Sequence, residues 1–415
     1  MTPSTRRAVF AFTLGCLGFA YAFVQRVAPS VMTGELMRDL SVGAAALGTL
    51  SAMYFYSYAV IQLPVGMLLD RFGPRKLLSA AMLVCAVASL AFAASDSVVS
   101  ASLSRAMVGA AVAFCFVGTL TIANLWLPAN RFATLAGLVQ SVGMMGAMLG
   151  QAPLRWMVDD LGWRGSFQAL AVVAALLAVS MFWVIPRRAQ RAEPRTADAP
   201  ALQGDNGSAL SVLRNPHTWR CALIGFALTP IMLAFAGLWA VPWMVQIHGF
   251  TEATAAGTAS LLFLGWAVGS VLSGFVSDLI GRKRPVLLLG GCLCVVCFSA
   301  LLFLQGLSHT ALSALFVLTG LGGATMVLTF GLVRTGNPPA HAAAAMGVVN
   351  TCVVGSGAVM QPLIGWLLEL QWDGQTRDGV QMFSQSTYQL AFSSLLVLLA
   401  IGVIATWLMP EHDPS

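Results

Sequence analysis

Long apolar stretches, separated by short polar or charged segments, run through almost the whole chain. Each is about 20 residues or longer, the length that a helix needs to cross a bilayer. Membrane-spanning β-strands would instead alternate in segments of about ten residues, so the pattern predicts helices. The predicted spans are 8–33, 45–69, 76–95, 100–124, 133–154, 166–185, 219–244, 253–276, 285–305, 308–332, 344–368 and 388–409.

The sixth and seventh predicted spans are separated by a segment rich in Arg, Ala, Asp and Pro. A segment of this composition does not bury a core, and we interpret it as a cytoplasmic linker. The sequence therefore predicts an all-α membrane protein with twelve transmembrane helices in two pseudo-symmetric six-helix bundles. The predicted parts are an N-terminal bundle at 1–185, a linker at 186–217 and a C-terminal bundle at 218–415.

Composition agrees with a membrane protein. Of 415 residues, 58% are hydrophobic and 9% charged, and the mean hydropathy is +0.81, whereas soluble domains carry about 25% charged residues. The net charge of +6 lies in short segments between apolar runs, which indicates membrane topology rather than nucleic-acid binding. The eight cysteines all fall inside apolar stretches, so we expect no metal site and no cofactor.

The basic residues predict the orientation, because cytoplasmic loops are enriched in Lys and Arg. With the N-terminus inside, 16 of the 22 basic residues are cytoplasmic. We therefore expect a multi-pass protein of a bacterial-type cytoplasmic (inner) membrane with both termini in the cytoplasm. The 16 are Arg6, Arg7, Arg71, Arg75, Lys76, Arg131, Arg187, Arg188, Arg191, Arg195, Arg214, Arg220, Arg282, Lys283, Arg284 and Arg334.

The two halves of the chain repeat each other. The segment from Gly66 to Lys76, GMLLDRFGPRK, matches the segment from Gly274 to Arg284, GFVSDLIGRKR, at a shift of 208. A second block matches at a shift of 210, where Gln140 meets Asn350, Gln151 meets Gln361 and Trp156 meets Trp366. Parallel repeats of six helices predict a substrate site near the middle of the membrane, at the interface of the repeats.

These features together resemble the major facilitator superfamily, and the closest resemblance is to bacterial anion:cation symporter-type members. Arg105-Ala-Met-Val-Gly109 in the fourth span resembles a second motif of that superfamily. The resemblance implies two bundles that rock about a central cavity, with the two repeated loops acting as a latch for one state. The residues implied in gating are Gly66, Asp70, Arg71, Gly73, Arg75, Lys76, Gly274, Asp278, Gly281 and Arg282.

Charged residues are scarce inside the predicted spans, and no acidic residue lies near a span centre. A charge within a span costs several kcal/mol and is a functional candidate by default. Arg26, late in the first span, is such a candidate, and an anionic substrate would supply its counter-charge. The symporter resemblance implies an anion-binding arginine here. The alternative is that Arg26 extends to the outer headgroups. Arg105 is a boundary residue or, as the second interpretation, a coupling or substrate-binding residue.

Neutral polar and aromatic side chains complete the candidate substrate site. Tyr54 and Tyr58 are four residues apart and share a helix face, and the matched amides recur at the repeat shift. Membrane-interface packing and interhelical hydrogen bonds are the alternative roles. The candidates for substrate binding are Arg26, Tyr54, Tyr58, Gln140, Trp239, Asn350 and Gln361.

The leading functional hypothesis is a secondary active transporter of a small organic, anionic solute, working by alternating access. We expect a small-molecule substrate, a co-transported proton or other ion, the lipid bilayer as surroundings and a monomeric protein. The sequence predicts no enzyme, because its spans hold no cluster of catalytic side chains or phosphate loop. Two alternatives stay open: an exporter of a drug or siderophore, and a transport-inactive membrane sensor on the same scaffold.

Overall fold

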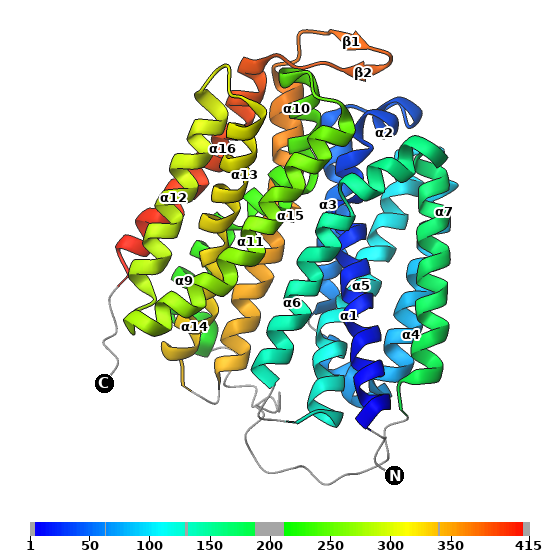
Figure 1. The fold of residues 1–415 in the computed structure, drawn as a ribbon, viewed down its shortest axis with the longest axis vertical. Coiled ribbons are helices and arrows are strands. Elements are labelled where there is room, and N and C mark those ends of the chain that lie inside the picture. Colours follow the sequence, from blue (N-terminus) through cyan, green and yellow to red (C-terminus); the bar gives the residue numbers. More distant parts are fainter. Residues whose placement is uncertain (1–4, 63, 129–131, 187–210, 339–340, 410–415) are drawn as a thin grey trace. The chain divides into compact units, whose positions relative to one another are not determined.

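The computed structural model describes residues 5–62, 64–128, 132–186, 211–338 and 341–409, and these are mostly helical (Figure 1). Most of the predicted linker, at 187–210, lies outside the described residues, as do Arg131, Arg187, Arg188, Arg191 and Arg195. By its internal packing the chain divides into two compact units. Unit 1 takes in Met1–Val42, Thr49–Ala197 and Asp378–Val380, and unit 2 takes in Gly43–Gly48, Asp198–Arg377 and Gln381–Ser415. The predicted domain boundaries stay predictions.

The first half of the chain supplies seven α-helices and a short 3₁₀-helix among the described residues. In chain order they are α1 (Thr5–Val27), the 3₁₀-helix η1 (Ala28–Val31), α2 (Thr33–Asp39), α3 (Ala44–Gln62), α4 (Val65–Ala93), α5 (Val98–Trp126), α6 (Phe132–Leu149) and α7 (Ala152–Val184).

The second half adds a π-helix and a two-stranded hairpin. In chain order its elements are α9 (Pro216–Leu228), the π-helix η3 (Ile231–Trp239), α10 (Ala240–His248), α11 (Glu252–Ile280), α12 (Arg284–Phe303), α13 (His309–Gly323), the 3₁₀-helix η4 (Ala324–Val327), α14 (Leu328–Thr335), α15 (Ala342–Leu370), β1 (Thr376–Arg377), β2 (Val380–Gln381) and α16 (Gln385–Trp407).

The described helices include 11 candidate membrane spans. One of these, Thr134–Val184, has 51 residues, more than twice the length that one crossing needs. Gly162, inside α7, has φ +68°, a conformation open to glycine because it has no Cβ, and it breaks the helix. Counting this stretch as two crossings gives twelve, so the chain is an all-α membrane protein, as predicted.

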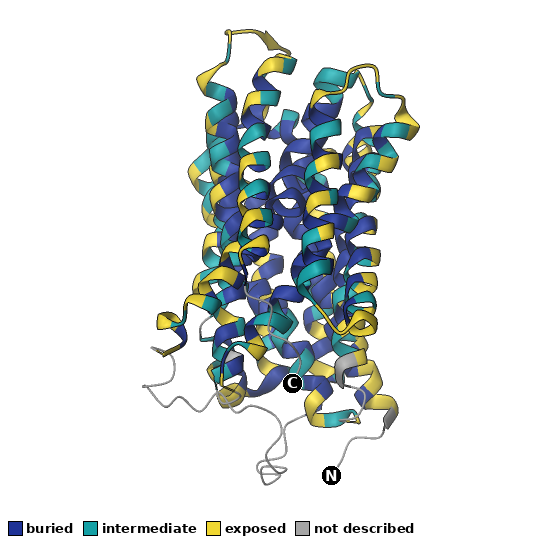
Figure 2. Ribbon diagram, turned by 90° about the vertical axis from the view of Figure 1, so that its left-hand side faces the viewer, coloured by how far each residue is buried: buried dark blue, intermediate teal, exposed yellow. Residues whose placement is uncertain are grey.

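The outward faces of the helices are apolar. On α7, Val172, Leu176, Val179 and Trp183 are all exposed, and their spacing places them on one side of the helix. Figure 2 shows exposed and half-buried residues along the length of the helices rather than only at their ends. Exposed apolar stripes of this length are typical of surfaces in contact with lipid.

Close helix contacts repeat between the halves. A Cβ on Gly109 of α5 would lie 2.1 Å from the carbonyl oxygen of Tyr54 in α3, so these backbones approach within the space that only glycine leaves. Gly320 of α13 stands in the same relation to Leu262 of α11, again at 2.1 Å. The paired positions are shifted by about 210 residues, so the repeat found in the sequence also describes the packing.

Several predicted spans differ from the observed helices, because the sequence pattern did not predict where a helix ends or bends. The first predicted span, 8–33, is α-helical only to Val27 and continues as η1, which contains Pro29. The seventh, 219–244, is three segments: α9, the π-helix after Pro230, and α10. The fifth and sixth, 133–154 and 166–185, are replaced by α6 and by α7 with its break at Gly162. Pro29, Pro230 and Gly162 lie at these breaks. Proline removes a backbone hydrogen-bond donor, and glycine can adopt a positive φ.

Candidate functional site

Arg26 lies in the last turn of α1 and is buried, at 8% exposure. Its guanidinium carbon is 4.1 Å from the centroid of the Phe23 ring, 5.6 Å from those of Tyr54 and Tyr58, and 5.9 Å from that of Phe55. The Nε atom has no hydrogen-bond partner. The side chain is therefore held by cation–π contacts inside unit 1 rather than extended to headgroups.

The position of Arg26 on its helix favours its charge. The carbonyl end of a helix carries partial negative charge, which stabilises a cation in the last turn. Tyr54 and Tyr58, on α3, stack with their ring centroids 6.2 Å apart and an interplanar angle of 15°. The tyrosine spacing recognised in the sequence thus forms an aromatic wall beside the cation.

Arg105 of α5 is fully buried, so its side chain does not extend to the surface of the protein. It lies in the eighth position of a helix that begins at Val98, and its Nη1 donates to the backbone oxygen of Gln25 at 2.6 Å. The Nε and Nη2 atoms have no partner. Its guanidinium carbon lies 5.2 Å from the Tyr54 centroid, so two guanidinium groups flank one ring.

A small polar network, missed in the sequence, adjoins the two arginines. The amide nitrogen of Gln25 donates to the Tyr21 hydroxyl at 2.6 Å and to the Ser89 hydroxyl at 2.9 Å. The Tyr21 and Ser89 hydroxyls are 3.2 Å apart, and Gln25 Oε1 has no partner. The available signal was the pair Tyr21 and Gln25 at i, i+4, next to Arg26.

No described acidic residue pairs with Arg26 or Arg105. Ion pairs described in unit 1 involve other arginines: Arg38 with Asp39, Arg155 with Glu35 and Asp159, and Arg164 with Asp96. A buried cation without an acidic partner is costly, and the cost falls when an anion binds. Unit 1 therefore holds two buried guanidinium groups beside aromatic rings, a candidate anion site because guanidinium pairs well with carboxylate and phosphate groups.

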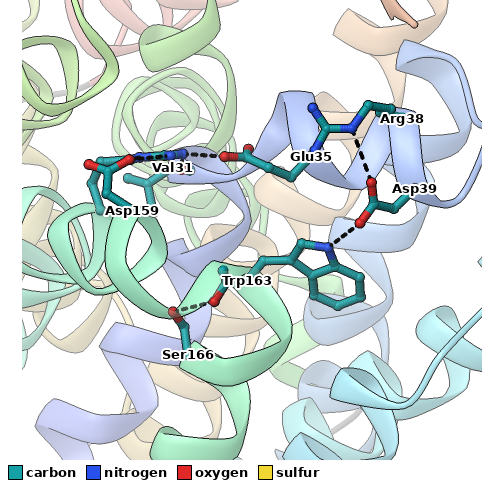
Figure 3. Close-up of polar contacts among 9 residues, drawn as sticks. Val31, Glu35, Arg38, Asp39, Asp159, Trp163 and Ser166 are labelled. Carbon is teal, nitrogen blue, oxygen red and sulfur yellow. Dashed lines mark hydrogen bonds and ion pairs between the residues drawn. The ribbon is translucent and has the colours of Figure 1, made fainter. Parts of the chain in front are cut away.

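Three charged residues near the C-terminal end of α1, Glu35, Arg155 and Asp159, form a cluster that we call the clasp. Glu35 and Asp159 are labelled in Figure 3. Arg155 Nη1 donates to Glu35 Oε1 and to the carbonyl of Val31, both at 2.7 Å, and Nη2 bonds to Asp159 at 2.6 Å. The clasp joins η1, α2 and α7. Sequence spacing did not reveal it, because Glu35 and Arg155 are 120 residues apart.

A third carboxylate, Asp39, lies beside the clasp in Figure 3. The Trp163 indole donates to Asp39 Oδ2 at 2.8 Å, and Arg38 Nε contacts Oδ1 at 3.2 Å. The indole hydrogen bond, with a smaller contribution from Arg38, holds the pKa of Asp39 below its usual value.

In unit 2 the predicted residues Trp239 and Gln361 support the π-helix η3. Gln361 Nε2 donates to the Leu233 carbonyl at 2.8 Å, and Trp239 Nε1 donates to the backbone oxygen of Gln361 at 3.1 Å. Both side chains are fully buried, and Gln361 Oε1 has no partner. π-Helical segments occur often at functional sites, so both residues stay candidates for the substrate site.

The remaining predicted amides are Gln140 in unit 1 and Asn350 in unit 2. Gln140 on α6 and Asn350 on α15 are half-buried, and no described hydrogen bond involves either side chain. Within the described parts of the chain, no group of three or more His, Cys, Asp or Glu side chains is placed to hold a metal.

The first predicted gating loop is a turn inside α4. Gly73 has φ +77° and ψ 157°, and the helix breaks there as the sequence implied. Asp70, in the stretch before it, is exposed. Arg75, just after it, places its guanidinium carbon 4.5 Å from the Phe182 ring centroid. The other members are half-buried Gly66, exposed Arg71 and exposed Lys76.

The second predicted gating loop follows the same plan in unit 2. Gly274 and exposed Asp278 lie in the last part of α11, and Gly281 ends the helix with φ +72°. Arg282 follows and is exposed. The two turn glycines thus share a positive φ at a shift of 208, which explains why this position is glycine in both copies.

Comparison with known proteins agrees with this fold. The family model of the Major Facilitator Superfamily matches residues 14–362 and 234–415, which together cover most of the chain. The chain belongs to the Major Facilitator Superfamily. Its relatives are named transporters, so it is a multi-pass membrane transporter of small molecules and not an enzyme.

Two relatives carry names that specify anionic cargo. The "Probable galactarate/D-glucarate transporter GudP" of Bacillus subtilis is 24% identical over 312 residues, covering 66% of this chain and 68% of the relative. The "Probable sulfoacetate transporter SauU" of Cupriavidus necator is 23% identical over 410 residues, covering 94% and 91%. A bacterial homologue of the human lysosomal transporter Spinster shares the fold, with a TM-score of 0.80, 16% identity and full coverage of both chains.

Proposed function

We propose that the protein is a secondary active transporter that moves a small organic anion across the cytoplasmic membrane by alternating access. The observation that carries the proposal is Arg26, a buried guanidinium ringed by four aromatic side chains and lacking a carboxylate partner among the described residues. An anion with a carboxylate or sulfonate group supplies the missing charge. The named cargoes of the two relatives, sugar diacids and sulfoacetate, belong to this chemical class.

In this proposal Tyr54 and Tyr58 form the wall against which the bound anion and Arg26 rest. We propose Gln140 of unit 1, and Trp239, Asn350 and Gln361 of unit 2, as further substrate-binding residues. Gly66, Asp70, Arg71, Gly73, Arg75, Lys76, Gly274, Asp278, Gly281 and Arg282 form the gating loops.

The proposed topology places both termini in the cytoplasm. Arg7, near the N-terminus, donates to the last carbonyls of α7, Val184 at 3.0 Å and Trp183 at 3.1 Å. Arg75 lies near the same end of α7, with its guanidinium carbon 4.5 Å from the Phe182 ring centroid, so basic residues gather at this end, as is typical of a cytoplasmic face. We further propose a monomer whose uptake is driven by a co-transported proton or other ion.

The test is uptake by purified protein in liposomes, screened over organic anions, amino acids and sugars, with and without a proton gradient. The proposal predicts saturable uptake of at least one organic anion and no uptake of an uncharged analogue of the same size. Efflux from loaded liposomes measures the direction of transport and so tests the exporter alternative.

Two substitutions sharpen this test. Arg26→Ala and Arg26→Lys should abolish anion uptake, because lysine cannot reproduce the flat, bidentate donor edge of arginine. Arg38→Ala is the matched control, since Arg38 also lies in unit 1 but is exposed, and it should retain uptake. Full uptake by Arg26→Ala, with normal membrane insertion, would refute the anion site.

A further inference from the structure

The carbonyl of Gln25 lies where α1 stops being an α-helix. In a continuing α-helix this oxygen would accept the N–H of residue 29. Residue 29 is proline, which has no backbone N–H, and the chain changes at Ala28 to the 3₁₀-helix η1. Pro29 therefore leaves the Gln25 carbonyl without its helical donor.

Arg105 supplies a donor from another helix. Its Nη1 lies 2.6 Å from the Gln25 oxygen, and both residues are fully buried. Burial makes this contact valuable, because an unsatisfied carbonyl away from water costs free energy. A cation at the carbonyl end of a helix also meets the negative end of the helix dipole, which offsets part of the cost of burying Arg105.

The carbonyl of Gln25 and the nitrogen of Arg26 belong to one planar peptide unit. A side chain that holds this carbonyl holds the peptide plane to which the Cα of Arg26 is bonded, and so limits the directions that the Arg26 side chain can take. The preceding turn is held in a similar way, since the Tyr54 hydroxyl donates to the Ala22 carbonyl at 3.0 Å. Donors from α5 and α3 thus hold α1 at the residue that carries the site's cation.

We propose that Arg105 is a positioning residue that caps the carbonyl left free by Pro29 and thereby aims Arg26 at the transported anion. The proposal rests on the function proposed above, because it gives Arg26 the role of anion ligand. It replaces the coupling role expected for Arg105 from the sequence. A coupling residue for protons has to gain and lose a proton, whereas arginine stays charged at any relevant pH.

The experiment is a double-mutant cycle on purified full-length protein, with wild type, Arg105→Met, Pro29→Ala and the double variant. Methionine keeps an extended side chain but donates no hydrogen bond, and alanine at 29 returns the N–H that Gln25 lacks. Each protein is measured by thermal unfolding, and in liposomes by the half-saturation concentration and maximal rate of uptake. Arg105→Lys, which keeps a charged donor, is the conservative variant.

We expect Arg105→Met to raise the half-saturation concentration about tenfold or more, with a smaller change in maximal rate, because a buried charged hydrogen bond is lost. In the Pro29→Ala background the same substitution should raise it less than about threefold. The unfolding temperature should show the same coupling, and Arg105→Lys should retain most of the affinity. A coupling role would instead lower the maximal rate and would not respond to Pro29→Ala.

The two readouts separate the possible failures. If Arg105→Met has the same effect in the wild-type background as in the Pro29→Ala background on both the unfolding temperature and the half-saturation concentration, the capping role of Arg105 is refuted. If unfolding temperatures show coupling but Arg105→Met leaves the half-saturation concentration unchanged while Arg26→Ala abolishes uptake, the positioning role is refuted and the proposed function stands. If Arg26→Ala retains uptake, the proposed function fails, and the positioning role fails with it.

Discussion

The clasp of Glu35, Arg155 and Asp159 provides a quantitative prediction about stability. Glu35→Gln keeps the shape of the side chain but removes the charge that faces Arg155. The Arg155 and Glu35 side chains are 7% and 18% exposed, and their atoms are 2.7 Å apart. Asp96 provides the matched control, because it pairs with Arg164 at 3.2 Å but is 91% exposed.

The burial of each pair sets the expected magnitude. Hydrogen bonds to charged groups contribute about 1.5–3 kcal/mol, whereas exposed ion pairs contribute about 0–1 kcal/mol. Arg155 keeps its contacts with Asp159 and the Val31 carbonyl, so Glu35→Gln should cost about 1–2 kcal/mol. For a unit of this size that corresponds to a fall of about 2–8 °C in melting temperature. Asp96→Asn should lower the melting temperature by less than Glu35→Gln does, by about 0–4 °C.

The assay is thermal unfolding of purified, detergent-solubilised protein, followed by intrinsic fluorescence at low and at 0.5 M salt. Salt should leave the Glu35→Gln effect nearly intact, since buried pairs are screened less than exposed ones. Equal shifts for Glu35→Gln and Asp96→Asn, or a larger shift for the exposed pair, would refute the reasoning from burial.

Three further predictions address packing, pH and gating. A Cβ on Gly146 would lie 2.2 Å from the Ala20 carbonyl, whereas one on Gly137 would meet no atom within 4 Å; Gly146→Ala should therefore lower the melting temperature and Gly137→Ala leave it unchanged or raised. Because the pKa of Asp39 is lowered in the folded protein, its ionised carboxylate stabilises the fold at pH values above the ordinary aspartate pKa of about 4. This stabilisation is lost as the pH falls through the lowered pKa. Asp39→Asn should thus lower the melting temperature at pH 6, with a smaller difference from wild type at pH 3, and an equal difference at both would contradict it. Asp70→Asn should lower the maximal uptake rate at least fivefold with little change in half-saturation concentration, and an equal loss of affinity would place Asp70 in the substrate site.

The sequence predicted the features of the fold that depend on local pattern and on the repeat. Apolar stretches located the spans, and the matched loops located Gly73 and Gly281, both of which have a positive φ. Local pattern did not reveal the π-helix at Ile231–Trp239, because its stabilising contact with Gln361 comes from a helix 128 residues away. Neither did it reveal the break at Gly162 inside a continuous helical stretch.

Some residues of the candidate site were predicted from the sequence, whereas the contacts between distant helices were not. Arg26 stood out because a charge inside an apolar stretch needs an explanation, and Tyr54 and Tyr58 followed from helical spacing. The burial of Arg105 and its bond to the Gln25 carbonyl did not follow, since the two residues are 80 positions apart. The clasp around Arg155 was missed for the same reason. Contacts between distant helices depend on how the helices pack, which a single sequence does not show.

The central claim is that Arg26 binds the charged group of the transported anion. Its most direct test is equilibrium binding, by isothermal titration, of the anion identified in the uptake screen to wild type, Arg26→Ala and the exposed control Arg38→Ala. A lost bidentate contact to an acid group should weaken binding about 100-fold in Arg26→Ala, while Arg38→Ala binds as wild type does. Equal affinity in all three proteins would contradict the claim.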